Sequence, residues 1–449
     1  MLRENTADLE FGGGVLESEA APAPVMDAPP AWSPAKRIAF RFLFSYFVLY
    51  IFPFPLEYVP FLEKVMGFYQ TFQDSLVTWV GRTVFHVTIT VQPNGSGDTT
   101  WNYVQLFLYG VLALASTVVW SILDRRRTQY ARLHEWLRVY VRLYVAVAML
   151  SYGAFKIIKS QFPAPGLDRL MQPYGDSSPM GLLWTFMGAS TLYTFFGGLS
   201  EAIGGALLAF RRTTLLGALV SAGVMLNVVM LNFSYDVPVK LYSSHLLLMA
   251  LFLAAPDVRR LLDFFVLHRP VETVPDRPLF QGKWTHRGAL ALRTVFFLYA
   301  FGFALNLSYQ GYKQYATAPV GKTPLEGTWT VEELTSDGQV RPPLITDATR
   351  WRRVTFGGPG RMAIQLMDDS RQGFLAKLNP MQRTLALTRR GETKPSSHLT
   401  YQFPEKRVVL LEGDYEGKKV RAKLRKEDPK KFLLVTRGFH WINENPFNR

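Results

Sequence analysis

Six ionisable or amide side chains lie inside long apolar segments between residues 137 and 257. They are Arg142, Lys156, Glu201, Asn227, Asn232 and His245. A bilayer centre disfavours such groups strongly, so in membrane proteins they face the interior of a helix bundle and mark functional sites. The sequence therefore predicts a membrane protein with a polar interior, although no motif identifies its chemistry.

Glu201 and Arg142 are predicted to form a deep polar pair. Glu201 lies about ten residues before Arg211-Arg212, which is roughly 15 Å of helix rise. Arg142 lies about one turn inside a neighbouring apolar segment, counted from the same side. Such a pair could be a proton or substrate site. It could equally neutralise two charges and fix the helix register, and the residues leave both interpretations open.

A second polar cluster is expected nearer the opposite face. Its members are Lys156, Asn227, Asn232, Asp236, Lys240 and His245. Pro238 suits the first turn of a helix, so Asp236 is expected at or just before that helix's N-cap. A histidine beside amide and carboxylate groups could relay protons or hold a polar head group such as a quinone ring. Snorkelling lysines and ordinary interhelical hydrogen bonds are the alternative explanation.

The residue types exclude several other chemistries. The chain has no cysteine, which excludes thiolate metal sites and thiol–disulfide exchange. It has no His-Glu-x-x-His, Gly-x-Ser-x-Gly or phosphate-loop motif, and its histidines are scattered, so no metal site is expected. Spacing alone leaves open paired histidine ligands for a haem from different helices, which is the less favoured interpretation. The net charge of +15 comes largely from Lys and Arg between apolar segments and in a basic tail. We therefore expect contact with a lipid bilayer and none with nucleic acid.

The polar residues are positioned by a predicted α-helical transmembrane bundle of about seven spans. The expected spans cover residues 37–56, 103–123, 137–158, 180–210, 214–233, 240–255 and 288–307, and residues 58–86 are expected to form an amphipathic interfacial helix. Arg-rich loops at residues 125–138, 211–212 and 259–293 would lie on one side. This charge bias predicts a cytoplasmic N-terminus and an extracytoplasmic C-terminus.

The C-terminal part changes to a β pattern. Short alternating segments separated by turn residues are expected as strands at 328–334, 351–356, 361–367, 373–378, 384–388, 399–403, 408–412, 418–424 and 432–436. They predict an all-β antiparallel barrel or sandwich. Gly327-Thr328-Trp329 resembles the Gly-x-Trp opening of lipocalin-type barrels.

These patterns divide the chain into five parts. We predict a disordered cytoplasmic segment at 1–36, two spans with an external amphipathic segment at 37–136, and a four-helix membrane core at 137–262. A cytoplasmic loop and the last span occupy 263–310, and a soluble β-domain occupies 321–449.

The segment from Met149 to Leu261 resembles the DoxX/DoxD-like family of integral membrane proteins. The resemblance rests on three stretches with the sequences YGAFK (152–156), GLSEAIGGALL (198–208) and NFSYDVPVK (232–240), together with Arg211-Arg212. It covers about a quarter of the chain and implies a four-helix membrane core. The family takes its name from a subunit of a quinol oxidase and thiosulfate:quinone oxidoreductase, so the resemblance implies an association with quinones or redox systems and no catalytic residues.

Two functions of different classes are therefore expected. The first is a bacterial inner-membrane protein that binds a quinone or similar lipid as an accessory to a membrane redox partner subunit. The second is a non-enzymatic scaffold that presents the β-domain outside the membrane for lipid or partner binding. A transporter is less favoured, because the spans show no convincing inverted repeat.

Overall fold

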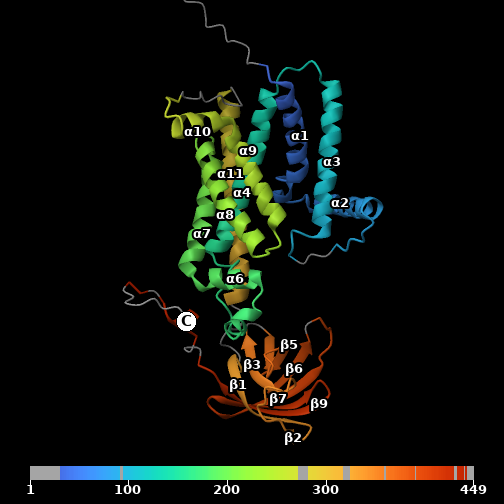
Figure 1. Ribbon diagram of the computed structural model, residues 1–449, viewed down its shortest axis with the longest axis vertical. Helices are drawn as coiled ribbons and strands as arrows, with labels where there is room; N and C mark the ends of the chain where they lie inside the picture. Colours follow the sequence, from blue (N-terminus) through green and yellow to red (C-terminus); the bar gives the residue numbers. More distant parts are fainter. Residues whose placement is uncertain are drawn as a thin grey trace, which may run out of the picture.

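The computed structural model describes residues 31–91, 95–271, 282–316, 324–357, 360–389, 391–428, 432–438 and 440–441. Its N-terminal part is a bundle of helices, and its C-terminal part is a closed antiparallel β-barrel (Figure 1). The predicted fold class, a helical bundle followed by an all-β domain, is confirmed. The predicted disordered segment lies almost wholly outside the described residues.

Helices make up the whole of the first part. They are α1 (Pro34–Ile51), α2 (Glu63–Val84), α3 (Thr100–Leu123), α4 (Ala131–Ile157), α5 (Leu167–Leu170), α6 (Pro179–Ala189), α7 (Thr191–Ala209), α8 (Thr214–Ser234), α9 (Lys240–Ala254), α10 (Val258–Phe265) and α11 (Lys283–Ala316). Among the described residues, six helical segments are long and apolar enough to cross a membrane, with mean hydropathies from 1.3 to 2.1: Pro34–Tyr58, Thr100–Leu123, Thr191–Ala209, Thr214–Ser234, Lys240–Phe265 and Lys283–Lys313. Their outer faces expose large apolar side chains, which suits contact with lipid. Helix α4, predicted as a span at 137–158, is not among them.

Helix α4 lies in the middle of the bundle and packs against α1, α7, α9 and α11. Its buried face includes Leu137, Val141, Val145 and Met149. It packs most extensively on α7, where glycines allow the two backbones to approach closely. A Cβ atom added to Gly153 would lie only 2.8 Å from the carbonyl oxygen of Gly198. Small residues serve the same purpose in many membrane helix pairs.

The span predicted at 180–210 is two helices and not one. Helix α6 ends at Ala189 and α7 begins at Thr191, and α6 crosses the end of the bundle (Figure 1). Ser190 separates them, because its side chain accepts a hydrogen bond from the backbone N–H of Tyr193 at 3.2 Å and so starts a new helix. Helix α7, with 19 residues, is long enough to cross the bilayer alone.

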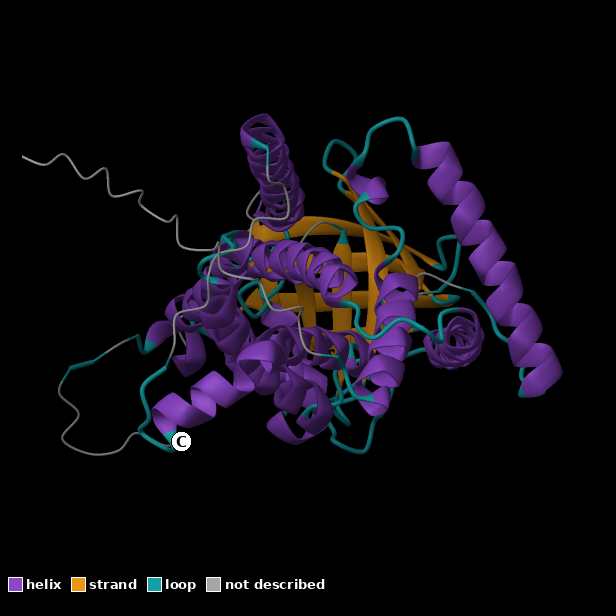
Figure 2. Ribbon diagram, turned by 90° about the horizontal axis from the view of Figure 1, so that it is seen from above, coloured by secondary structure: helices purple, strands orange, loops and turns teal. Residues whose placement is uncertain are grey.

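Helix α2 occupies the region predicted to be amphipathic. It lies across the direction of the bundle in both views (Figures 1 and 2). Val77 and Val80 pack against Ile89 and Val104, whereas Phe68 and other large apolar residues of α2 are exposed. Such a helix, apolar on an outer face and lying across the spans, suits the membrane interface.

The two ends of the bundle differ. Helix α1 begins at the end that also carries the α3–α4, α7–α8 and α9–α10 connections, and the barrel lies at the opposite end, beyond α6 (Figure 1). The Arg-rich connections and the β-domain are therefore on opposite sides of the apolar helices.

The barrel is built from eight strands that form a closed antiparallel ring. Its strands are β1 (Gly327–Ser336), β3 (Trp351–Gly357), β4 (Arg361–Leu366), β5 (Arg371–Asn379), β6 (Thr384–Arg389), β7 (Ser397–Glu405), β8 (Val408–Tyr415) and β9 (Lys418–Lys426), and β2 (Gln339–Val340) extends one end of β1. Strand β9 pairs with β1 and closes the ring, with Trp329 opposite Lys426.

A continuous cluster of buried apolar side chains fills the described barrel interior. Trp329 is 1% exposed and donates its indole N–H to the carbonyl of Leu325 at 2.6 Å, while Lys426 Nζ lies 5.3 Å from its ring centre. Arg350 is also buried and donates hydrogen bonds to backbone carbonyls that include those of Arg341 and Trp351. The described interior is therefore a packed core.

The strand predicted at 432–436 is wrong. Residues Leu433–Thr436 form a short helix, α12, whose apolar side chains are exposed. The pairing of β1 with β9 leaves no free edge in the ring for a further strand. The alternating apolar pattern alone could not reveal that the ring was already complete.

Candidate functional site

A cavity of about 330 Å³ lies inside the four-helix core, near the end of the bundle that faces the barrel. Helices α4, α6, α7, α8 and α9 line it. Met149, Met225 and Leu246 close it on one side, and the packed cluster of Phe162, Leu183, Met187 and Val237 closes the side next to α6. Most of the lining is apolar, and its polar groups include Lys156, Glu201, Asn227 and Asn232. This combination is typical of sites for small apolar ligands with a polar head.

A buried ion pair lies in the cavity wall. Lys156 Nζ donates to both carboxylate oxygens of Glu201, at 2.8 and 2.7 Å, and the two side chains are 9% and 3% exposed. The ammonium also lies 5.5 Å from the ring centre of Tyr152 and 5.9 Å from that of Phe162. Each charge is compensated by its partner, as buried charges must be, and the aromatic faces add favourable electrostatics for the cation.

The close contact of α4 with α7 sets the register of this pair. A Cβ atom added to Gly198 would lie 2.8 Å from the carbonyl oxygen of Gly153 and 2.8 Å from Cβ of Lys156. Only a glycine therefore allows the Lys156 stem to cross α7 at this point. Because Glu201 follows Gly198 by nearly one turn, its carboxylate meets the end of that stem.

The predicted pairing of Glu201 with Arg142 is wrong. Arg142 precedes Lys156 by fourteen residues, which separates them by about 21 Å along α4. Its guanidinium instead donates to the hydroxyl of Thr214 at the start of α8, at 3.0 Å. Since α4 and α7 run in opposite directions, Arg142 lies level with the far end of α7 and Lys156 lies level with Glu201.

The predicted second cluster separates into three groups. Lys156, Asn227 and Asn232 line the cavity, and Asn232 donates to the hydroxyl of Ser243 at 3.0 Å. Asp236 and Lys240 form an ion pair at 2.8 Å outside the cavity lining. His245 faces α1. Three of the six predicted residues therefore line one cavity, and the other three make contacts elsewhere.

His245 connects α9 to α1. Its Nδ1 lies 2.7 Å from the carbonyl of Leu241, its Nε2 lies 2.7 Å from the hydroxyl of Tyr46, and its ring stacks on Tyr50 with centres 4.1 Å apart. A carbonyl only accepts, so Nδ1 carries the proton, and in the neutral ring Nε2 accepts from Tyr46. These contacts orient the side chain toward α1. The prediction that His245 belongs to one polar cluster with Lys156 is therefore wrong.

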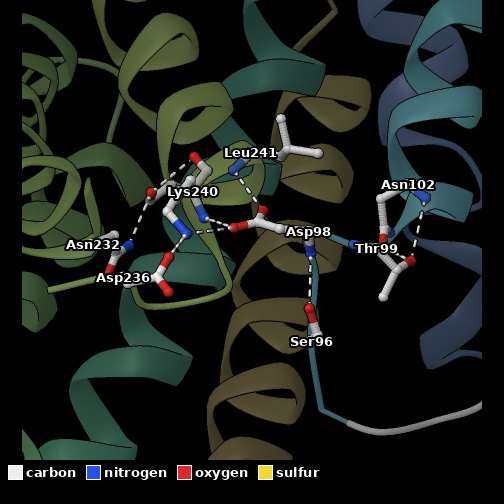
Figure 3. A network of polar contacts seen from close by, with 9 residues as sticks. Ser96, Asp98, Thr99, Asn102, Asn232, Asp236, Lys240 and Leu241 are labelled. Carbon is white, nitrogen blue, oxygen red and sulfur yellow. Dashed lines mark hydrogen bonds and ion pairs between the residues drawn. The ribbon is translucent and has the colours of Figure 1, made fainter. Parts of the chain in front are cut away.

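Asp98 is a structural residue that the sequence did not reveal. It lies between α2 and α3 and accepts hydrogen bonds from the backbone N–H groups of Lys240 and Leu241, at 2.8 and 3.0 Å (Figure 3). Asp236, expected at or just before the N-cap of this helix, lies three residues before it, because the N-cap residue is Val239. A carboxylate from a distant loop supplies the acceptors instead. The turn-rich sequence before Asp98 indicated only a loop.

The described residues hold no group of three or more His, Asp or Glu side chains placed to bind a metal ion. The polar groups that line the cavity include an amine, a carboxylate, amides and hydroxyls. These groups can orient a polar head by hydrogen bonding.

Comparison with known proteins finds a relative of part of this chain. The protein YwoB of Bacillus subtilis (strain 168), itself described as uncharacterized, is 30% identical over 126 residues, which are 79% of YwoB and 28% of this chain. The chain belongs to the YwoB family. The relationship to YwoB covers little more than a quarter of the chain. No family model matches the chain, and no solved structure matches it.

The cavity of this YwoB-family member can hold an apolar molecule and hydrogen-bond to one polar end of it. Lysine has three N–H donors, and Glu201 accepts from Lys156 with both carboxylate oxygens. The described residues provide no hydrogen-bond acceptor for a third N–H of Lys156. A ligand carbonyl could take that position without displacing the carboxylate.

Proposed function

We propose that this chain is a bacterial inner-membrane protein of the DoxX-like type that binds a lipid-soluble quinone in the core cavity. It would act as an accessory component of a respiratory or redox system, in contact with a membrane redox partner subunit. The observation that carries the proposal is the buried Lys156–Glu201 pair in an otherwise largely apolar cavity. Ionisable residues inside membrane bundles are rare, pair with one another and commonly mark a functional site.

The residues of the cavity fit a quinone head. A quinone ring is flat and apolar on its faces, and its carbonyl oxygens only accept hydrogen bonds. Lys156 offers a donor, and Tyr152 and Phe162 offer aromatic surface beside it. A bound quinone would supply electron-carrying chemistry. The protein's own residues would bind the head, hold its orientation and exclude water from it.

The ion pair also favours a neutral head over a charged one. Because Glu201 neutralises Lys156, the pair has no net charge, and a phosphate or carboxylate would enter the apolar cavity without a counter-charge. A neutral carbonyl compound does not carry this penalty.

Sidedness follows from the positive-inside rule. The Arg-rich α3–α4 and α7–α8 connections lie at the end opposite the barrel (Figure 1). We therefore place the N-terminus in the cytoplasm and the barrel outside the cytoplasmic membrane.

The test is to purify the full chain in mild detergent and analyse the extracted lipids by mass spectrometry. We expect a quinone in stoichiometric amount with the wild-type protein and a loss of most of it from Glu201→Gln, because that change removes the charge that holds Lys156. The matched control is Glu135→Gln, which removes the carboxylate of a partly exposed Arg138–Glu135 pair on α4, outside the cavity lining. Extraction of only bulk phospholipid from the wild type would contradict the proposal.

A scaffold is the second candidate, and the packed barrel favours it. The barrel has its own core and a described contact with the bundle in which Arg371 donates to the carbonyl of Asp168 at 2.7 Å. Its filled interior suits binding by the outer surface. Deletion from residue 327 onward would then abolish the cellular function, whereas Glu201→Gln would leave it unchanged.

A further inference from the structure

We infer that the ligand enters the cavity sideways, from the hydrocarbon core of the bilayer, through an opening between α7 and α8. Its polar head would occupy the cavity while its tail stays among the lipids. This inference rests on the proposed quinone-binding function and adds the entry route and the class of ligand, a head group with a long apolar tail.

The first observation is that some lining residues are also surface residues. Tyr193 and Phe196 of α7 line the cavity and are 45% and 61% exposed. Gly223 and Asn227 of α8 line it too and are exposed. All four lie on the two helices that face each other across the opening. The cavity therefore reaches the outer surface of the bundle between α7 and α8.

The second observation is that α7 and α8 are in close contact near their connection, whereas the cavity rim on α8 has free space beside it. Near their connection, a Cβ atom added to Gly204 would lie 2.7 Å from the hydroxyl of Ser221, and one added to Gly217 would lie 2.7 Å from the amide nitrogen of Leu208. Further along α8, a Cβ atom added to Gly223 would meet no atom within 4 Å. Gly223 follows Ser221 by two residues and therefore lies on another face of α8. The space beside this exposed lining residue is open.

The other sides of the cavity are closed. Met149, Met225 and Leu246 are 1%, 4% and 2% exposed, and Phe162, Leu183, Met187 and Val237 are similarly buried next to α6. Together with the α4 and α9 walls, these side chains separate the cavity from both ends of the bundle. Among the described lining residues, those beside the α7–α8 opening are the exposed ones named above.

The size of the cavity requires the tail to remain outside. A volume of about 330 Å³ is at the lower end of the range of about 300–1,000 Å³ for ligand sites. It can hold a ring-sized head but not a chain of many isoprene units. The surface beside the opening, which includes Leu192, Leu226 and Met230, is exposed and apolar, so a tail leaving the cavity would meet lipid-like surroundings.

The experiment compares two probes in nanodiscs of synthetic phosphatidylcholine. One is ubiquinone-10, and the other is the tail-less benzoquinone that carries the same head. In the Gly223→Trp variant an indole would occupy the opening, where the glycine has free space. The matched control is Gly110→Trp on α3, where an added Cβ atom also meets nothing within 4 Å.

We expect Gly223→Trp to weaken ubiquinone-10 binding by about tenfold or more and to change binding of the tail-less probe by less than about threefold. Gly110→Trp should change neither. Unchanged ubiquinone-10 binding in Gly223→Trp would overturn the sideways route while leaving the quinone site standing. Failure of both probes to bind the wild type would instead refute the proposed function.

A spectroscopic measurement tests the opening without any ligand. Since the chain has no cysteine, a nitroxide label on Asn227→Cys is unique. We expect its relaxation to respond more strongly to oxygen, which concentrates in lipid, than to a water-soluble nickel chelate. A label on Glu135→Cys, at the Arg-rich end of α4, should respond in the opposite way. A stronger response of the Asn227 label to the nickel chelate would overturn the proposed entry from the lipid.

Discussion

At the scale of single residues, the Lys156–Glu201 pair combines stability with function. Two charges taken out of water lose hydration, and their attraction offsets this loss only while both partners remain. Removing one partner leaves a buried charge without compensation, which is worse than removing both. Comparing single and double variants can therefore distinguish the contribution of the pair to stability from its contribution to ligand binding.

The asymmetry gives a testable prediction. Glu201→Leu should lower the free energy of unfolding by about 3–5 kcal/mol, and the double change Lys156→Met with Glu201→Leu should recover most of that loss. Thermal unfolding in detergent measures the stability, and mass spectrometry of extracted lipids measures the binding. The double variant should remain unable to retain quinone although it is folded. A double variant no more stable than Glu201→Leu would contradict the account.

A second residue-scale prediction concerns acid stability of the barrel. The hydroxyl and the backbone N–H of Thr349 donate to Asp347 Oδ1 at 2.7 and 3.0 Å, and they lower the pKa of this carboxyl below its ordinary value of 3.8. A lowered folded-state pKa stabilises the fold above pH 3.8, and the stabilisation is lost as pH falls from 3.8 through the folded-state value.

Asp347→Asn should therefore reduce the difference in barrel stability between pH 7 and pH 3. Tryptophan fluorescence during thermal unfolding would measure it. The exposed Asp236→Asn, in the helical part, is the control and should leave the barrel's pH dependence unchanged. An equal acid sensitivity in Asp347→Asn and the wild type would refute this role.

At the scale of elements, the contacts between helices and their register explain which features of the site could be predicted from the sequence. The residue types inside the apolar segments indicated Lys156, Glu201, Asn227 and Asn232 as candidates. Their partners depended on the register of α4 against α7, which the close glycine contacts determine and no single-helix pattern contains. The same limit applies to the cap of α9, because Asp98 is more than a hundred residues away from it in the chain.

The cap of α9 provides the element-scale prediction. Asp98 is 8% exposed and accepts from two backbone N–H groups, so Asp98→Ala should destabilise the protein by about 1–2 kcal/mol. It should also loosen the α2–α3 connection, which the hydrogen bond from the Gly97 N–H to the Pro238 carbonyl also holds.

Hydrogen exchange of the first turn of α9, compared between variants in nanodiscs, measures the effect. Asp236→Ala is the control, because its carboxylate is 84% exposed and pairs with the side chain of Lys240, whereas Asp98 accepts from backbone N–H groups of α9. Similar exchange in Asp98→Ala and Asp236→Ala would show that the cap contributes little.

At the scale of the whole molecule, the bundle and the barrel have separate cores. The alternation of apolar residues and the spacing of turns predicted eight of the barrel strands, since each buries one face in a common interior. The same pattern could not show that β9 returns to β1, so it added a false strand at 432–436. The break at Ser190 was also hidden, because α6 and α7 are both apolar.

Separate cores predict that the barrel folds alone. A fragment of residues 324–428 should be monomeric and should unfold cooperatively, with near-ultraviolet circular dichroism from the packed Trp329 and Trp351. Quinone retention by the complementary helical fragment would assign the cavity to the bundle alone. A fragment that lacks tertiary signal would show that the bundle is needed to complete the barrel.

The exposure of Tyr193 and Phe196 at the rim of the cavity determines which ligand concentration controls occupancy of the cavity. If the rim meets lipid, occupancy of the cavity depends on the mole fraction of the ligand among the surrounding lipids and not on its concentration in water. Two ligands with identical heads would then compete according to how each partitions and mixes in the bilayer. The lipid composition of the host membrane would then select among ligands before any of them contacts the protein.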